Sequence, residues 1–191
     1  MKKPILAATA TLLCATQAHA AEEKPAPEDP LAAVAMDKNE GCLTGPVAQF
    51  GRYLGDWTMT DWTLSPDGKN WTQGKGARWN FTCVGNGIAV QDFWMPHGGG
   101  QGTNLRIYDA KTRAWDISWT AKSSPGLSHI KAKQDESGQI VMRYVTPKQN
   151  PARRITFYPP TDTGWDWTLD ISTDGEKTWL RVFKMTASKA R

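Results

Sequence analysis

Residues 115–120 read Trp115-Asp116-Ile117-Ser118-Trp119-Thr120, so apolar and polar side chains alternate along this segment. Residues 165–171 read Trp165-Asp166-Trp167-Thr168-Leu169-Asp170-Ile171 and have the same period of two. Successive side chains of a β-strand point to opposite faces of its sheet, so each segment predicts a strand with one buried face. Together the two segments indicate a sheet with one apolar side.

Similar segments recur along the chain after residue 54, bounded by clusters of Gly, Pro, Asn and Asp. Further strands are expected at 55–64, 74–84, 87–94, 102–109, 127–134, 139–146, 152–158 and 178–187. No segment between them has the length of a crossover helix, which excludes a parallel sheet. The links at 109–112 and 135–138 are short enough for hairpins, so strands that are neighbours in sequence are expected to pair.

A meander of about ten strands leaves two bare edges unless it closes on itself. We therefore predict an all-β fold, a single antiparallel up-and-down β-barrel. Pro46 suits the first position of a helix, and Phe50 and Leu54 share one helical face at a spacing of four. A short N-terminal helix of one or two turns is therefore expected before the first strand.

The first twenty residues have the pattern of a secretory signal peptide. Lys2 and Lys3 are positively charged, residues 5–15 are mostly apolar, and Ala18-His19-Ala20 is a small-x-small cleavage site. The apolar run is shorter than the roughly 20 residues that span a bilayer. The sequence thus predicts cleavage after Ala20 and a periplasmic or secreted protein without a membrane span.

Residues 21–45 begin with prolines and acids among few apolar side chains, which predicts a disordered leader followed by a short helix. Residues 46–191 are left as one barrel domain. Without the two lysines of the predicted signal peptide, 21 Lys and Arg stand against 19 Asp and Glu, and the longest basic run is Arg153-Arg154. Because the numbers of basic and acidic side chains are nearly equal, nucleic acid is not expected as a partner.

Cys42 and Cys83 are the cysteines that remain after signal cleavage. In an oxidising compartment an even pair predicts a disulfide, the alternative being two buried free thiols. No second Cys or His stands at ligand spacing from either one, so no metal site is predicted.

The segment from Phe50 to Trp57, which ends in Gly55-Asp56-Trp57, resembles the Gly-x-Trp signature at the first strand of lipocalins and their calycin relatives. The runs 102–109, 115–119 and 172–179 resemble bacterial exported lipocalin-like domains of unknown function. The resemblance implies structural roles for Gly55 and Trp57, with Trp57 closing one end of the barrel. It also implies that a basic side chain after the last strand covers this indole, and Arg191 is the best match.

Residues 172–179 also resemble the Asp-box hairpin of sialidases and other propellers, with Glu176 in place of a glycine. This second resemblance implies a turn in which an Asp accepts hydrogen bonds from the backbone, and no catalytic role. The chain has too few strands for the blades of a propeller, which argues against a sialidase.

Motifs of catalysis are scarce, so whether the protein is an enzyme stays open and no catalytic residue or cofactor is predicted. There is no Gly-x-Ser-x-Gly motif, and His97 and His129 are the histidines outside the signal peptide. The glycine-rich run 95–102 lacks the Gly-Lys-Ser/Thr of phosphate-binding loops and is expected to be a mobile loop at the barrel mouth. Nitrobindins, which are similar barrels, bind haem through a His near the chain end. This sequence has no His there, so haem is not predicted as a ligand.

The ten tryptophans all follow residue 56, and they either fill the barrel or line a binding site. By strand alternation Arg181 shares a face with Phe183 and Met185. An arginine in an aromatic lumen needs an acid such as Asp92, or the acidic group of a ligand. The predicted ligand-binding residues are Trp94, Trp119, Trp167, Trp179 and Arg181.

These patterns favour binding of a small hydrophobic or amphipathic molecule, with an acidic group, inside the barrel. One alternative is an isomerase or hydrolase that uses the same lumen. Another is a filled barrel that acts as an envelope structural or protein-interaction module.

Overall fold

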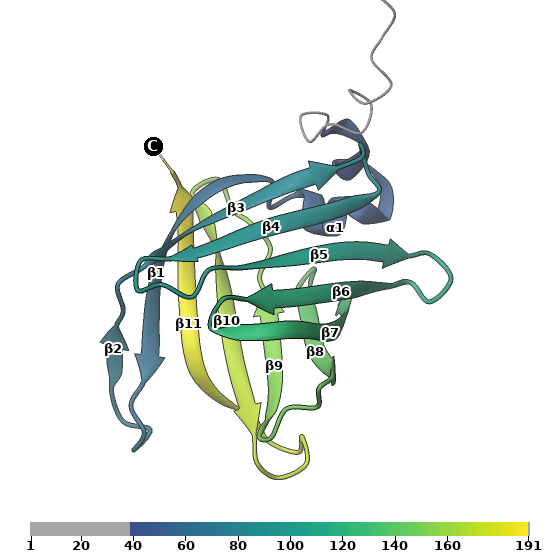
Figure 1. The fold of residues 1–191 in the computed structure, drawn as a ribbon. Coiled ribbons are helices and arrows are strands. Elements are labelled where there is room, and N and C mark those ends of the chain that lie inside the picture. The colour runs from purple at the N-terminus through teal and green to yellow at the C-terminus, as the bar shows by residue number, and fades with distance from the viewer. Residues whose placement is uncertain (1–38, 191) are drawn as a thin grey trace, which may run out of the picture.

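The computed structural model describes residues 39–190, so the predicted signal peptide and most of the predicted leader lie outside the described residues. Eleven strands form one antiparallel sheet (Figure 1). Their bounds are β1 (Gly55–Leu64), β2 (Trp71–Gln73), β3 (Ala77–Val84), β4 (Ala89–Pro96), β5 (Gly102–Asp109), β6 (Ala114–Ala121), β7 (Ser124–Gln134), β8 (Ile140–Thr146), β9 (Ala152–Phe157), β10 (Gly164–Ser172) and β11 (Leu180–Lys189).

The sheet closes because β11 pairs with β1, along a register that runs from Trp57 opposite Lys189 to Thr63 opposite Phe183. The other neighbours follow chain order from β3 to β11, while β2 pairs only with the far end of β1. The prediction of a closed, antiparallel, up-and-down barrel is therefore confirmed. Within residues 39–190, no helix combines the length and apolar character that crossing a bilayer requires.

Short helical turns precede the barrel and lie at one of its ends (Figure 1): η1 (Glu40–Cys42), η2 (Gly45–Val47) and α1 (Ala48–Gly51). Phe50 is fully buried, and its ring packs edge-on against those of Trp115, at 4.9 Å between centroids, and Phe157, at 5.4 Å. Tyr53 is also fully buried, and its hydroxyl donates a hydrogen bond to the Tyr158 carbonyl at 2.9 Å. These residues plug the barrel at the helical end. The short helix predicted before the first strand is confirmed.

The Gly-x-Trp segment lies at the same end. Trp57 is buried, and its Nε1 donates a hydrogen bond to the Tyr53 carbonyl at 2.7 Å. Its ring packs edge-on against that of Trp165, with 5.8 Å between centroids. Gly55 has a φ of 116°, which favours glycine. Arg191 lies outside the described residues, so its position over Trp57 stays a prediction.

A disulfide joins Cys42 to Cys83, as predicted, and both residues are fully buried. Cys42 belongs to η1 and Cys83 to β3, so the bond fixes the helical turns to the barrel wall. The folded unit thus includes residues before the predicted domain boundary at residue 46.

Replacing both cysteines by serine is expected to lower the free energy of unfolding by about 2–4 kcal/mol, because the open chain gains conformational entropy when unfolded. Chemical denaturation of the variant and of the parent protein measures the difference. Thiol titration of the denatured parent, made under oxidising conditions, should detect no free thiol. Two titratable thiols would contradict the disulfide.

The predicted strands occur in the structure with bounds shifted by up to three residues, and β2 was not predicted. The segment 74–84 forms a strand only from Ala77 onward, because Gly76 has a φ of 76° and turns the chain. The Asp61 side chain fixes this turn, its Oδ1 accepting a hydrogen bond from the Gly76 amide at 2.7 Å. The hairpins predicted at 109–112 and 135–138 are confirmed by the pairing of β5 with β6 and of β7 with β8.

Candidate ligand-binding lumen

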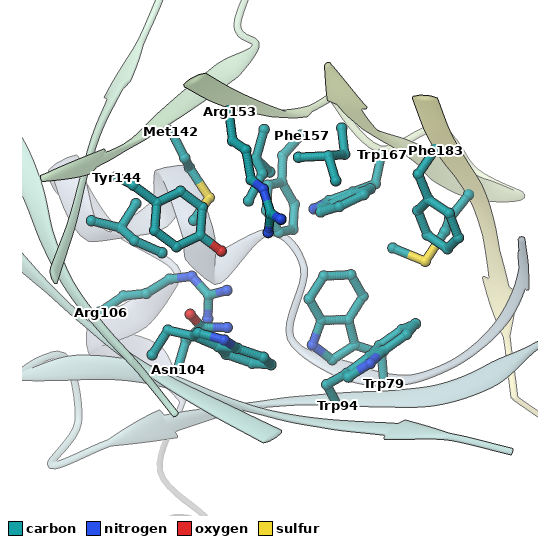
Figure 2. A pocket seen from close by; sticks show the side chains of 15 residues that line it. Trp79, Trp94, Asn104, Arg106, Met142, Tyr144, Arg153, Phe157, Trp167 and Phe183 are labelled. Atoms are coloured by element: carbon teal, nitrogen blue, oxygen red, sulfur yellow. The ribbon is translucent and has the colours of Figure 1, made fainter. Parts of the chain in front are cut away.

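The barrel encloses a cavity of about 330 Å³, within the size range of small-molecule pockets. Its walls come from strands around most of the barrel, and most of its lining is apolar (Figure 2). The lining residues are Trp79, Trp94, Asn104, Arg106, Trp119, Ile130, Met142, Tyr144, Arg153, Ile155, Phe157, Trp167, Leu169, Phe183 and Met185. The side chains of the barrel therefore do not fill its lumen.

Indole rings form one wall of the cavity. Trp79 packs edge-on against Trp94, with 4.9 Å between ring centroids, and against Trp167, at 6.3 Å. Trp94, Trp119 and Trp167 of the predicted ligand-binding set all line the cavity, although ligand binding by them stays a prediction. Sequence reasoning did not select Trp79, even though alternation along 77–83 gave a signal for it.

Arg181 and Trp179 of the predicted set do not line the cavity. The register between β10 and β11 shifts after Leu169: Leu169 pairs with Phe183, and Asp170 pairs with Arg181. Val182 is the extra residue of this bulge, and it reverses the face to which Arg181 points. The lumen-facing position predicted for Arg181 is therefore wrong.

Arg181 instead contacts side chains on the outer face. Its Nε lies 3.2 Å from Oδ1 of Asp170, and its Nη2 donates a hydrogen bond to the Tyr158 hydroxyl at 3.0 Å. The Trp179 ring lies near two guanidinium groups, those of Arg143 and Arg154, each 4.6 Å from the ring centroid. Both predicted residues thus belong to an outer network of charged and aromatic side chains.

The turn before Trp179 has the geometry that the Asp-box resemblance implies. Asp174 Oδ1 accepts hydrogen bonds from the Lys177 amide at 3.1 Å and from the Thr178 amide at 3.0 Å. The hydrogen bond from the Thr178 hydroxyl, followed by those from the Thr178 amide and the Ser172 hydroxyl, lowers the pKa of the Asp174 carboxyl. The segment shapes a turn on the surface and contributes nothing to the lumen.

Arg106 and Asp92 form an ion pair inside the barrel, and both side chains are fully buried. Asp92 also accepts hydrogen bonds from the backbone amide and side-chain amide of Asn104, each at 3.1 Å. Asp92 therefore pairs with Arg106. In the sequence, Asp92 is a candidate partner for Arg181, but Arg181 pairs with Asp170 instead. Burial lowers the pKa of the Arg106 guanidinium, and the nearby Asp92 carboxylate opposes that shift.

The Arg106 guanidinium lies against aromatic rings, with its carbon 4.7 Å from the Phe50 centroid and 5.2 Å from that of Phe81. Its Nε and Nη1 are buried and have no hydrogen-bond acceptor among the described residues. Because Arg106 also lines the cavity, these donors lie beside the lumen.

Arg153 is the second arginine of the lining, and it is exposed to solvent. Figure 2 shows the Arg106 and Arg153 guanidinium groups pointing into the cavity from β5 and β9. Burial raises the pKa of the neighbouring Tyr144 hydroxyl, and the charge of Arg153 opposes this shift. Within residues 39–190, no carboxylate lies at ion-pair distance from Arg153. Arg153 lies at the start of β9, whose other end carries Phe157 against the plug residue Phe50, so the exposed Arg153 marks a cavity mouth opposite the helical plug.

The two histidines lie away from the lumen. His129 Nε2 is 2.7 Å from Oδ1 of Asp116, and His97 Nδ1 is 3.0 Å from the Lys75 carbonyl. Across residues 39–190, no three His, Cys, Asp or Glu side chains gather in a way that could hold a metal ion.

No family model and no curated protein matches this chain. Among solved structures, the S-type phycobiliprotein lyase CPES from Guillardia theta is similar, with a TM-score of 0.54 and 11% sequence identity. The match covers 82% of this chain and 99% of that one. At this identity the similarity concerns the fold alone. Together with the closed barrel, it supports a calycin-like fold for this chain.

Proposed function

We propose that the barrel binds a small amphipathic molecule that carries one acidic group. The observation that carries this proposal is an aromatic-lined cavity of about 330 Å³ with one positive charge, Arg153, that no described acid balances. The other lining cation, Arg106, is already neutralised by Asp92. One anionic group on the ligand would therefore balance the charge of the lumen.

The acidic group is placed at Arg153, where the mouth meets solvent, and the apolar body extends inward along the indole wall. Burying apolar surface stabilises such a complex by about 25 cal/mol per Å². An acid at the mouth keeps part of its hydration, so its transfer is less unfavourable than full burial. The orientation thus satisfies both parts of an amphipathic molecule.

Binding is favoured over turnover by the chemistry of the lining. Its ionisable side chains are Arg106, Arg153 and Tyr144, and none of them is a nucleophile paired with a general base. The similar solved structure is described as a lyase for phycobiliproteins, which illustrates that a barrel of this shape can serve an enzyme. For this chain we propose binding without chemistry.

A periplasmic or secreted location is part of the proposal. The signal-peptide pattern of residues 1–20 supports it, and so does the Cys42–Cys83 disulfide, because disulfides persist in oxidising compartments.

Titration with decanoate, followed by tryptophan fluorescence, tests the proposal. Saturable quenching is expected because indoles line the cavity. Arg153→Met should weaken decanoate binding about tenfold, which corresponds to about 1.4 kcal/mol for a charged contact. Arg181→Met is the matched control, since it removes an arginine outside the cavity, and it should leave the affinity unchanged. Absence of saturable quenching, or an equal loss in both variants, would contradict the proposal.

A further inference from the structure

The inner part of the cavity presents hydrogen-bond donors that lack acceptors. The buried atoms Nε and Nη1 of Arg106, Nε1 of Trp79 and Nε1 of Trp167 have no partner among the described residues. All three residues line the same cavity. Buried donors are almost always paired in folded proteins, so this cluster indicates a place where water or a bound molecule supplies an acceptor.

The charge of the inner site favours a neutral acceptor over a second acid. Arg106 is already paired with Asp92, and Asp92 is held in place by Asn104. A ligand carboxylate on the free edge of Arg106 would lie close to a buried negative charge, with one cation to share between the two. A hydroxyl or carbonyl oxygen accepts from the same nitrogens without that repulsion.

Building on the proposed function, we propose that the ligand is an oxygenated acid. Its carboxylate binds Arg153 at the mouth, and a neutral hydroxyl or carbonyl oxygen at its far end accepts hydrogen bonds from Arg106. Figure 2 shows that the two guanidinium groups enter the lumen from separate walls and that the indoles of Trp79 and Trp167 lie to one side of both. The apolar part of the molecule then lies between two polar ends.

This arrangement selects against plain alkyl acids. Water can supply acceptors to Arg106 in the unliganded protein, and a ligand that displaces such water without replacing its hydrogen bonds loses affinity. A methyl end would leave the Arg106 donors unpaired, whereas an oxygen at that end would pair them. The preference for the oxygenated acid thus measures the contribution of Arg106.

The test compares ω-hydroxy acids from octanoate to dodecanoate, each with its unsubstituted parent acid, by isothermal titration calorimetry. At the chain length that spans the lumen, the hydroxy acid should bind about tenfold more tightly than its parent. In the double variant Arg106→Met/Asp92→Asn, which removes the buried ion pair, this preference should disappear. Arg181→Met, outside the cavity, should keep it.

The possible outcomes separate this inference from the proposed function. If the parent acids bind as tightly as the hydroxy acids at every length, the proposal of an oxygenated ligand is wrong, and the proposed binding of an acid in the lumen stands. Tighter binding of the matching dicarboxylates would also overturn the neutral acceptor. If no acid binds, both proposals fail. The comparison in the unmodified protein decides among these results even if the double variant does not fold.

Discussion

Substitution of Arg106 by methionine is expected to lower the free energy of unfolding by about 3–5 kcal/mol, because it leaves a buried charge without its partner. Asp92 is fully buried and would keep only the hydrogen bonds from Asn104. Methionine retains much of the volume of the arginine stem, so the loss is attributed to the charge and not to a cavity. Denaturation with urea, followed by circular dichroism, measures the change.

Arg78→Met is the matched control for this effect. Arg78 pairs with Asp56 at the surface, where the two side chains are 40% and 45% exposed, so its removal should change stability by less than about 1 kcal/mol. Adding Asp92→Asn to Arg106→Met should recover a large part of the lost stability, because the unpaired charge is then gone. A loss in Arg106→Met no larger than that in Arg78→Met would contradict a buried ion pair at the base of the lumen.

Substitution of Trp57 by alanine is expected to lower the free energy of unfolding by about 3–5 kcal/mol, as a large truncation in a packed core. Trp57 is buried against Trp165 at the closed end, and its Nε1 is hydrogen-bonded to the Tyr53 carbonyl. The variant therefore loses apolar packing and a buried hydrogen bond together. Thermal unfolding by differential scanning calorimetry measures the loss.

Trp71→Ala provides the comparison for the same change at the surface. Trp71 lies on β2, outside the closed barrel, and is 37% exposed, so its loss should be much smaller than that of Trp57. A loss near zero for Trp57→Ala, with an unchanged far-ultraviolet spectrum, would show that Gly55-Asp56-Trp57 does not close the barrel.

The fold was predictable because the strands repeat a simple rule. Trp115 and Ile117 are buried while Ser118 is exposed, as alternation predicts. The closure itself followed from the number of strands and the short links between them. The period of two therefore carries enough information to define the barrel.

The polar part of the lumen could not be predicted by the same rule, because β5 reverses it. On β5 the polar side chains of Asn104 and Arg106 are buried, while the apolar side chains of Leu105 and Ile107 are exposed. A pattern that assigns apolar residues to the core places Arg106 on the outer surface. The buried polar cluster becomes visible only when the register of β4 and β5 is known, because Asp92 then lies opposite Asn104. A single sequence does not give that register.

The placement of Arg181 failed for a different reason. Alternation from Met185 through Phe183 is correct, since both line the cavity, but the bulge at Val182 changes the phase before Arg181. A bulge inserts one residue without a distinctive sequence pattern, so a phase counted from one end of a strand does not hold past it. Trp94 lies on β4, whose pairings show no register shift, and in β6 the shift follows Trp119, so alternation placed both tryptophans correctly in the lumen.

Native mass spectrometry of the protein with decanoate is the most direct measurement of lumen binding. The lumen cavity with one unbalanced cation predicts a saturable complex with one bound acid, which is weakened by Arg153→Met and unaffected by Arg181→Met. A spectrum of unliganded protein at saturating decanoate, or a series of adducts that grows without a limit and is the same in both variants, would contradict a specific site in the barrel.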